Sequence, residues 1–188
     1  IIGAANGLQQ LWSVDRLSPV YTTITGSGFT TKELRLLNAG NVDEGELSVG
    51  GEVLSTKNGL VNNLWSQCLI INSESQKVLD HINVLTIENE KASVFVHASI
   101  FKALALSTLV QYFQSVPLKT GKNASFNTKA EVLTAAIDVL KATESSLDKA
   151  TGFTGLANSI NYKNTVYALL ARIYTIAGDN DNALKYAN

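Results

Sequence analysis

The 188-residue sequence predicts an all-α protein, built from antiparallel helix pairs with long irregular loops between them. Apolar residues recur at three- and four-residue steps over several long segments, which is the helical period. Sustained alternation of apolar and polar residues is absent from the sequence, and runs of β-branched residues are short. The longest apolar segment, residues 90–118, has the composition of a helix that other helices cover.

Residues 1–17 are predicted to form the first helix, which the pair Ser18-Pro19 would end. Residues 18–57 are predicted to be irregular, because they are rich in glycine, threonine and serine. Within them, only a short helical turn is expected, at Thr31 to Leu37. A loop of this length in a compact domain is usually functional or packed over the surface.

The helical pattern returns at residues 58–84 and again in the central segment. The central helix should end near Gln114, because Pro117 cannot continue a helix and disfavours helical backbone at Val116. We interpret it as a core helix and not as a membrane span, because polar residues interrupt it: His97, Lys102, Gln111 and several serines.

A capping-box pattern predicts where the helix after Pro117 begins. Thr128 is followed three residues later by Glu131, and the apolar period then continues to about Leu147. Polar loops are expected on both sides of this helix, at 120–127 and 148–160.

The C-terminal stretch carries a repeat signature. A helix is predicted to begin at Asn161 or Tyr162 and to run through Ala177, where Gly178 ends it, and Asp179 or Asn180 should cap the last helix. Small and large residues stand at tetratricopeptide spacings, namely Tyr167, Leu170, Ala171, Tyr174 and Ala183. One such helix pair cannot bury its own apolar face, so we expect a tetratricopeptide-like α-α superhelix.

Composition narrows the classes of function. Fifteen basic and sixteen acidic residues give a net charge of -1, so nothing in the charge balance indicates binding to nucleic acid or anionic lipid. A single cysteine, Cys68, excludes an intrachain disulfide and a thiolate metal cluster, and its apolar surroundings predict that it is buried. Both ends of the sequence are helical in character, so we expect residues 1–188 to be one helical domain and the N-terminal fragment of a longer protein.

Several short stretches keep a characteristic order and spacing along nearly the whole chain. They are Asn6–Trp12, Leu64–Trp65, Ile70–Asn72, Ala98–Leu118, Thr128–Leu140 and Tyr167–Leu184. Each is mostly a helix-packing pattern, but in this order they resemble the SusD/RagB-like proteins of Bacteroidetes. The chain departs from the family where Arg-Ala is usual before the aromatic run, since it has Lys102-Ala103.

The resemblance implies a protein that binds nutrients at the cell surface and performs no chemistry. Such proteins are lipid-anchored in the outer membrane and deliver glycans or other oligomers to a TonB-dependent, SusC-like transporter. Their N-terminal half holds tetratricopeptide-like helix pairs, and much of their ligand site comes from the C-terminal half. The lipid-bearing cysteine would lie outside this sequence, because Cys68 stands within a predicted helix.

An acidic stretch supplies the candidate ligand-binding residues, Asn41, Asp43 and Glu44. Their oxygen atoms could bind a cation or the hydroxyl groups of a sugar. The composition by itself favours a solvated loop, because calcium loops need a denser alternation of oxygen ligands. The resemblance favours the ligand interpretation, because an acidic segment near this point lies at the ligand face in the family.

Aromatic side chains in loops are the other candidates, because sugars stack on exposed rings flanked by polar groups. The rings predicted to lie in loops are those of Tyr21, Phe29, Phe126 and Phe153. Trp12 and Trp65 lie on apolar helical faces and are predicted to belong to the core.

Catalytic and metal-binding patterns do not emerge from the sequence. His81 and His97 lack metal-site spacing, and one cysteine with two histidines makes no convincing triad. The glycines Gly26 and Gly28 lack the remainder of a phosphate loop. We therefore expect no enzyme activity, metal or cofactor. The alternative to nutrient binding is a tetratricopeptide-type adaptor for a protein partner, although such an adaptor should continue with near-identical repeats of about 34 residues.

Overall fold

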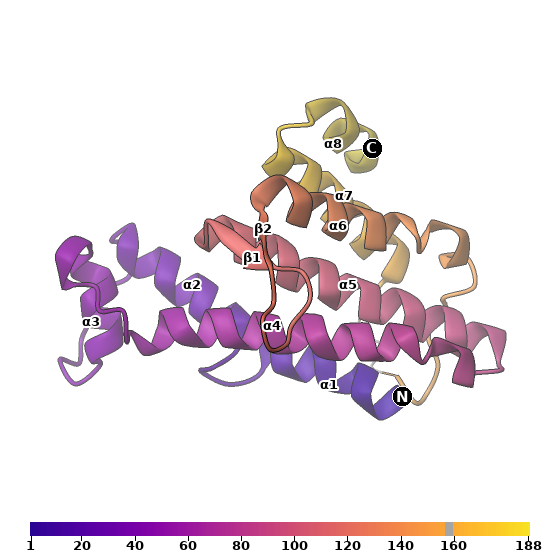
Figure 1. Cartoon of the computed structure of the whole chain (residues 1–188), viewed down its shortest axis with the longest axis horizontal. Coiled ribbons are helices and arrows are strands. Elements are labelled where there is room, and N and C mark those ends of the chain that lie inside the picture. Colours follow the sequence, from indigo (N-terminus) through magenta and orange to yellow (C-terminus); the bar gives the residue numbers. More distant parts are fainter. Residues whose placement is uncertain (157–159) are drawn as a thin grey trace. The chain divides into compact units, whose positions relative to one another are not determined.

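The computed structural model describes residues 1–156 and 160–188, and it is all-α apart from one small sheet (Figure 1). The predicted fold class is therefore confirmed. Contacts divide the chain into two compact units, where the sequence led us to expect one domain. Unit 1 comprises Ile1–Gln9 with Leu69–Asn188, and unit 2 comprises Gln10–Cys68. Two helices run from one unit into the other, α1 (Ile2–Ser13) and α4 (Gly59–Asp80).

Unit 2 contains two helices where an irregular region was predicted, so that prediction is wrong. They are α2 (Pro19–Thr30) and α3 (Val42–Val49). The pair Ser18-Pro19 does not end the first helix, which stops at Ser13; it begins α2. Proline suits the first turn of a helix, where its missing N–H is not needed, and Ser18 Oγ accepts a hydrogen bond from Tyr21 N at 3.2 Å.

Helix α2 was not predicted because its sequence is rich in threonine, which has a low helix propensity. Its hydroxyl groups bond to carbonyl groups one turn earlier, as Thr23 does to Pro19 at 2.7 Å and Thr30 to Gly26 at 2.9 Å. The apolar side of the helix is buried against α3 and the start of α4, in a small core of Phe29, Leu47 and Leu60. Tertiary packing therefore outweighs the low helix propensity of this stretch.

The expected helical turn at Thr31 to Leu37 does not form. Helix α2 ends at Thr30 with Thr31 as its C-cap, and the next residue, Lys32, has a φ of 66°, in the left-handed region, so the helix does not continue. The chain then runs without regular structure to α3, and a single 3₁₀ turn, η1 (Gly51–Val53), lies between α3 and α4.

Unit 1 is arranged around α5 (Glu88–Tyr112), the predicted central helix. The helices α6 (Lys129–Lys141) and α7 (Tyr162–Ala177) both pack on α5, and α8 (Asn180–Ala187) packs on α7 (Figure 1). By length and composition alone α5 could cross a membrane, but 83% of its most apolar window is buried inside the structure, as in the core helix of a soluble protein.

The segment after α5 turns back on itself. β1 (Ser115–Pro117) pairs antiparallel with β2 (Phe126–Thr128), with Val116 opposite Asn127. β2 leads directly into α6 through the predicted capping box, in which Thr128 and Glu131 bond to each other's backbone N–H. The expected continuation of this helix to Leu147 is wrong, because α6 ends at Lys141 and a 3₁₀ turn, η3 (Glu144–Ser146), follows.

The last helix pair forms as the cap signals predicted. Gly178 adopts a φ of 81° after α7, and Asp179 caps α8 through Asn182 N. Tyr186 of α8 stacks on Tyr174 with ring centroids 5.7 Å apart, and its ring centroid lies 5.9 Å from that of Tyr167. Two residues of the repeat signature thus contact the second helix through one aromatic ring.

Candidate binding site

The predicted ligand residues Asn41, Asp43 and Glu44 lie at the start of α3 in unit 2, and not in a loop. Asn41 occupies the N-cap position, although its side chain makes no capping hydrogen bond within the described structure. Asp43 Oδ1 accepts a hydrogen bond from Gly59 N at 2.9 Å and so joins α3 to the first residue of α4. A Cβ atom at Gly59 would lie 2.5 Å from Asp43 Oδ2, which shows how closely the two helices approach there.

Glu44 is buried, with 2% of its surface exposed. Its Oε1 lies 2.5 Å from Arg16 Nη2 and 3.4 Å from the hydroxyl group of Tyr21. The hydrogen bond and charge of Glu44 raise the pKa of Arg16. These contacts give Glu44 a structural role in unit 2, and Asp43 has one through α4. Binding of a ligand by Asn41, Asp43 and Glu44 stays a prediction.

Among the four candidate rings, that of Phe153 lines a cavity in the described part of the chain. Phe29 is buried in the core of unit 2, and Tyr21 lies on α2. Phe126 is 64% exposed on β2. Phe153 lines a cavity of about 670 Å³ in unit 1, which we call the Phe153 pocket.

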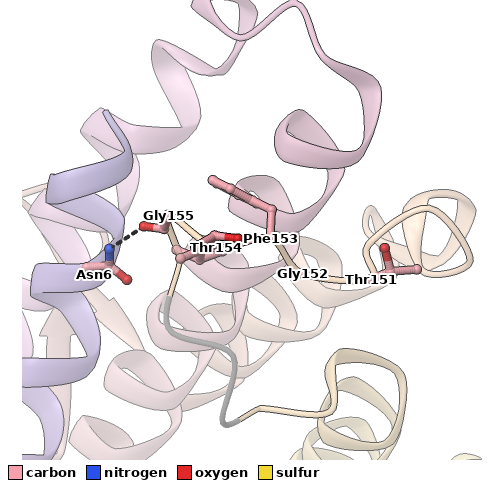
Figure 2. A pocket seen from close by; sticks show the side chains of 7 residues that line it. Asn6, Thr151, Gly152, Phe153, Thr154 and Gly155 are labelled. Carbon is pink, nitrogen blue, oxygen red and sulfur yellow. Dashed lines mark hydrogen bonds between the residues drawn. The ribbon is translucent and has the colours of Figure 1, made fainter.

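The Phe153 pocket lies between the loop at 151–156 and α1. Figure 2 shows Asn6 on α1 facing the loop, where its Nδ2 donates a hydrogen bond to Gly155 O at 2.8 Å. The side chain of Phe153 projects from the same loop, next to Thr154. A volume of this size is within the range of small-molecule sites.

Helix α5 holds the first part of the loop in place. Asn89 Oδ1 accepts hydrogen bonds from Thr151 N and Oγ1 at 3.3 and 3.1 Å, and Asn89 Nδ2 donates to Gly152 O at 3.0 Å. Ser93 Oγ accepts a hydrogen bond from Gly152 N at 3.0 Å. Two neighbouring turns of a buried helix therefore fix the backbone that carries the pocket.

Two glycines are required by the shape of this loop. Gly152 has a φ of 78°, a backbone angle that residues with a side chain rarely adopt. A Cβ atom at Gly155 would lie 2.9 Å from Cε2 of Phe153, so the ring rests directly against the glycine backbone. A larger residue than glycine at position 155 would therefore have to displace the ring.

The lining suits a neutral, hydroxyl-rich ligand. It consists of an aromatic ring, the amide of Asn6, the hydroxyl groups of Thr151 and Thr154, loop backbone and one buried leucine, and no charged side chain is among the described residues that line it. Aromatic rings with a few polar groups around them are the usual composition of sites that orient such ligands.

Among the residues that line this pocket, the sequence had indicated only Phe153 as a candidate for ligand binding. Asn6 was missed because it lies 149 positions from Gly155, and no local pattern connects the two. The available signal was the polar, glycine-containing loop at 148–160 with one aromatic residue in it.

The remaining reactive side chains lie elsewhere. His97 is fully buried on α5, and burial lowers its pKa to about 4; His81 is exposed after α4. Burial raises the pKa of Cys68 to about 12, in agreement with its predicted buried position. Across residues 1–156 and 160–188, no group of three or more His, Cys, Asp or Glu side chains is arranged to hold a metal ion.

Comparison with protein-family models, with curated proteins and with solved structures found no match to this chain.

Proposed function

We propose that this protein binds a neutral glycan, or another uncharged hydroxyl-rich oligomer, in the Phe153 pocket. The observation that carries the proposal is an aromatic ring held against a glycine beside uncharged polar groups, in a loop fixed by α5. The flat faces of sugar rings stack on aromatic side chains, while hydroxyl and amide groups bind the sugar hydroxyls.

In this proposal the protein is a non-catalytic binding subunit. It would work at the outer-membrane surface, anchored by a lipid in the full-length protein, and pass its ligand to a TonB-dependent, SusC-like transporter. The sequence resemblance to SusD/RagB-like proteins supports this part. It is tested by co-purification of the full-length protein with such a transporter from the outer membrane.

Binding is tested by screening the 188-residue protein on an array of neutral and acidic oligosaccharides, followed by calorimetry with the ligand found. Phe153→Ala should weaken binding about tenfold or more, because stacking on the ring is lost. Gly155→Ala should also weaken it, because the new methyl group displaces the ring. Phe126→Ala is the matched control, since Phe126 is exposed but lies outside the pocket.

Two results would contradict the proposal. One is that the protein binds none of the neutral saccharides on the array. The other is that it binds a neutral saccharide with the same affinity as the Phe153→Ala variant does.

A tetratricopeptide-type adaptor is the second candidate, favoured by the α7–α8 pair, in which Tyr186 packs on two tyrosines of the repeat signature. An adaptor would bind a peptide or protein by this helical surface, and Phe153→Ala would leave that affinity unchanged. The same variant therefore separates the two functions.

A further inference from the structure

We propose that unit 1 has a second binding pocket, which takes a small hydroxyl-rich ligand with a carboxylate group, of the uronic acid class. The pocket lies between the second half of α4 and the segment after β1, and its volume is about 480 Å³. We call it the α4 pocket. It shares no lining residue with the Phe153 pocket and does not depend on the proposed function.

One wall of the α4 pocket offers hydrogen-bond acceptors. Asn72 is 2% exposed; its Nδ2 donates to Leu118 O at 3.0 Å, while its Oδ1 has no partner in the described part of the chain. A buried acceptor without a partner is unfavourable, so this wall has an unmet demand for a donor. One turn further along α4, Gln76 Nε2 donates to Asp80 Oδ1 at 2.7 Å, which orients the carboxylate at the pocket. Ligand hydroxyl groups are the complement of these acceptors.

The opposite wall offers donors. Lys119 and Thr120 are exposed and make no hydrogen bond or ion pair in the described part of the chain. Their backbone is held from two sides, because Leu118 O accepts from Asn72 and Leu118 N donates to Asn127 Oδ1 at 3.2 Å. The segment that carries Lys119 is therefore held in place, and its ammonium group can bind an anion in the pocket.

The charges favour a monoanion. Two lysines and one aspartate line the pocket. Lys77 is paired with Glu74, with Nζ and Oε1 2.6 Å apart, and Lys102 of α5 donates to Gln76 Oε1 and lies close enough to Asp80 to feel its charge. Lys119 therefore supplies the positive charge that has no such partner in the described part of the chain. A carboxylate can bind Lys119 while its hydroxyl groups point to Asp80, whereas a doubly charged phosphate would be repelled more strongly by Asp80. This pattern of donors and acceptors distinguishes a uronic acid from its neutral parent sugar.

The experiment is an NMR titration of the 188-residue protein with sodium glucuronate and, separately, with glucose. Glucuronate should shift the amide signals of residues 118–120 and 72–80 saturably at millimolar concentration, and glucose should bind at least about fivefold more weakly. Lys119→Gln should weaken glucuronate binding about tenfold, because a charge-assisted hydrogen bond is lost.

Lys122→Gln is the matched control, because it removes the same charge from the same segment but outside the pocket. It should change the affinity less than twofold, and Phe153→Ala should leave it unchanged. The inference is overturned if glucuronate gives no saturable shifts at these residues, or if glucose binds equally well. It is also overturned if the two lysine variants weaken binding equally, since the effect would then be one of net charge. Loss of glucuronate binding in Phe153→Ala would assign the ligand to the first pocket instead.

Discussion

His97 Nε2 lies 3.0 Å from the main-chain oxygen of Ala5, so the middle of α5 is hydrogen-bonded to the first helix of the chain. His97 Nδ1 lies 3.4 Å from the hydroxyl group of Tyr162 at the start of α7. One neutral imidazole can make both bonds, because Nε2–H donates to Ala5 and Nδ1 accepts from Tyr162. The buried histidine thus connects three segments of unit 1 without any charge.

The stability of the protein should fall as the pH is lowered from about 6.5 to about 4. Burial lowers the pKa of His97 from its ordinary 6.5 to about 4, so in this window the unfolded chain takes up a proton that the folded chain does not. One such proton makes the free energy of unfolding fall by up to about 1.4 kcal/mol per pH unit. Urea denaturation at several pH values measures the slope.

The histidine contribution is isolated by comparing variants, because carboxyl groups also titrate near the lower end of this range. His97→Gln should be less stable at neutral pH and should show a shallower slope between pH 6.5 and 4. His81→Gln is the control, since His81 is exposed, and it should keep the slope. An equal slope in all three proteins would contradict the assignment to His97.

Helices with local end signals could be predicted from the sequence. The box of Thr128 and Glu131, and the Gly178-Asp179 turn, each satisfy helix ends with groups only a few residues away. The pair Ser18-Pro19 can signal either the end or the start of a helix, because proline stops a preceding helix and also suits the first turn of the next one. The helix α2 then depends on burial against α3 and α4, which no local pattern reveals.

The candidate site was predictable in part for a related reason. An aromatic residue in a polar loop is a visible signal, and Phe153 was among four such residues. What distinguishes it is the approach of α1 through Asn6 and the support of α5 through Asn89 and Ser93. Both are contacts between segments far apart in the sequence. The acidic stretch was expected in a loop, but Asp43 lies on α3 and its carboxylate accepts a hydrogen bond from the first residue of α4. Ligand binding by this stretch stays a prediction.

Arg16→Ala should destabilise unit 2 by about 1–3 kcal/mol at neutral pH, the cost of leaving a buried charged group without its main partner. Glu44, which is 2% exposed in the intact protein, would keep only the longer contact to Tyr21. Arg35→Ala is the control, because Arg35 is an exposed arginine in the same unit without an ion pair in the described structure. Chemical denaturation should show the loss for Arg16→Ala alone, and equal stability of the two variants would contradict the role of the pair.

Tyr186→Ala should loosen the last helix pair, and Tyr186→Phe should do so only slightly. The ring of Tyr186 lies almost parallel to that of Tyr174, at an interplanar angle of 9°, and contacts Tyr167 as well. Its hydroxyl group donates to Glu144 Oε1 at 2.7 Å, at an exposed site where the bond contributes little. Aromatic pairs contribute about 0.5–1.5 kcal/mol beyond the area they bury, so loss of both ring contacts should cost about 1–3 kcal/mol, and loss of the hydroxyl group less than about 1 kcal/mol.

Amide hydrogen exchange of α8 measures the loosening directly, with Leu184→Ala as the control because that side chain is 64% exposed on the same helix. If Tyr186→Ala exchanges no faster than Leu184→Ala, α8 is held by its backbone and by Ala183, and the tyrosine rings do not join the pair.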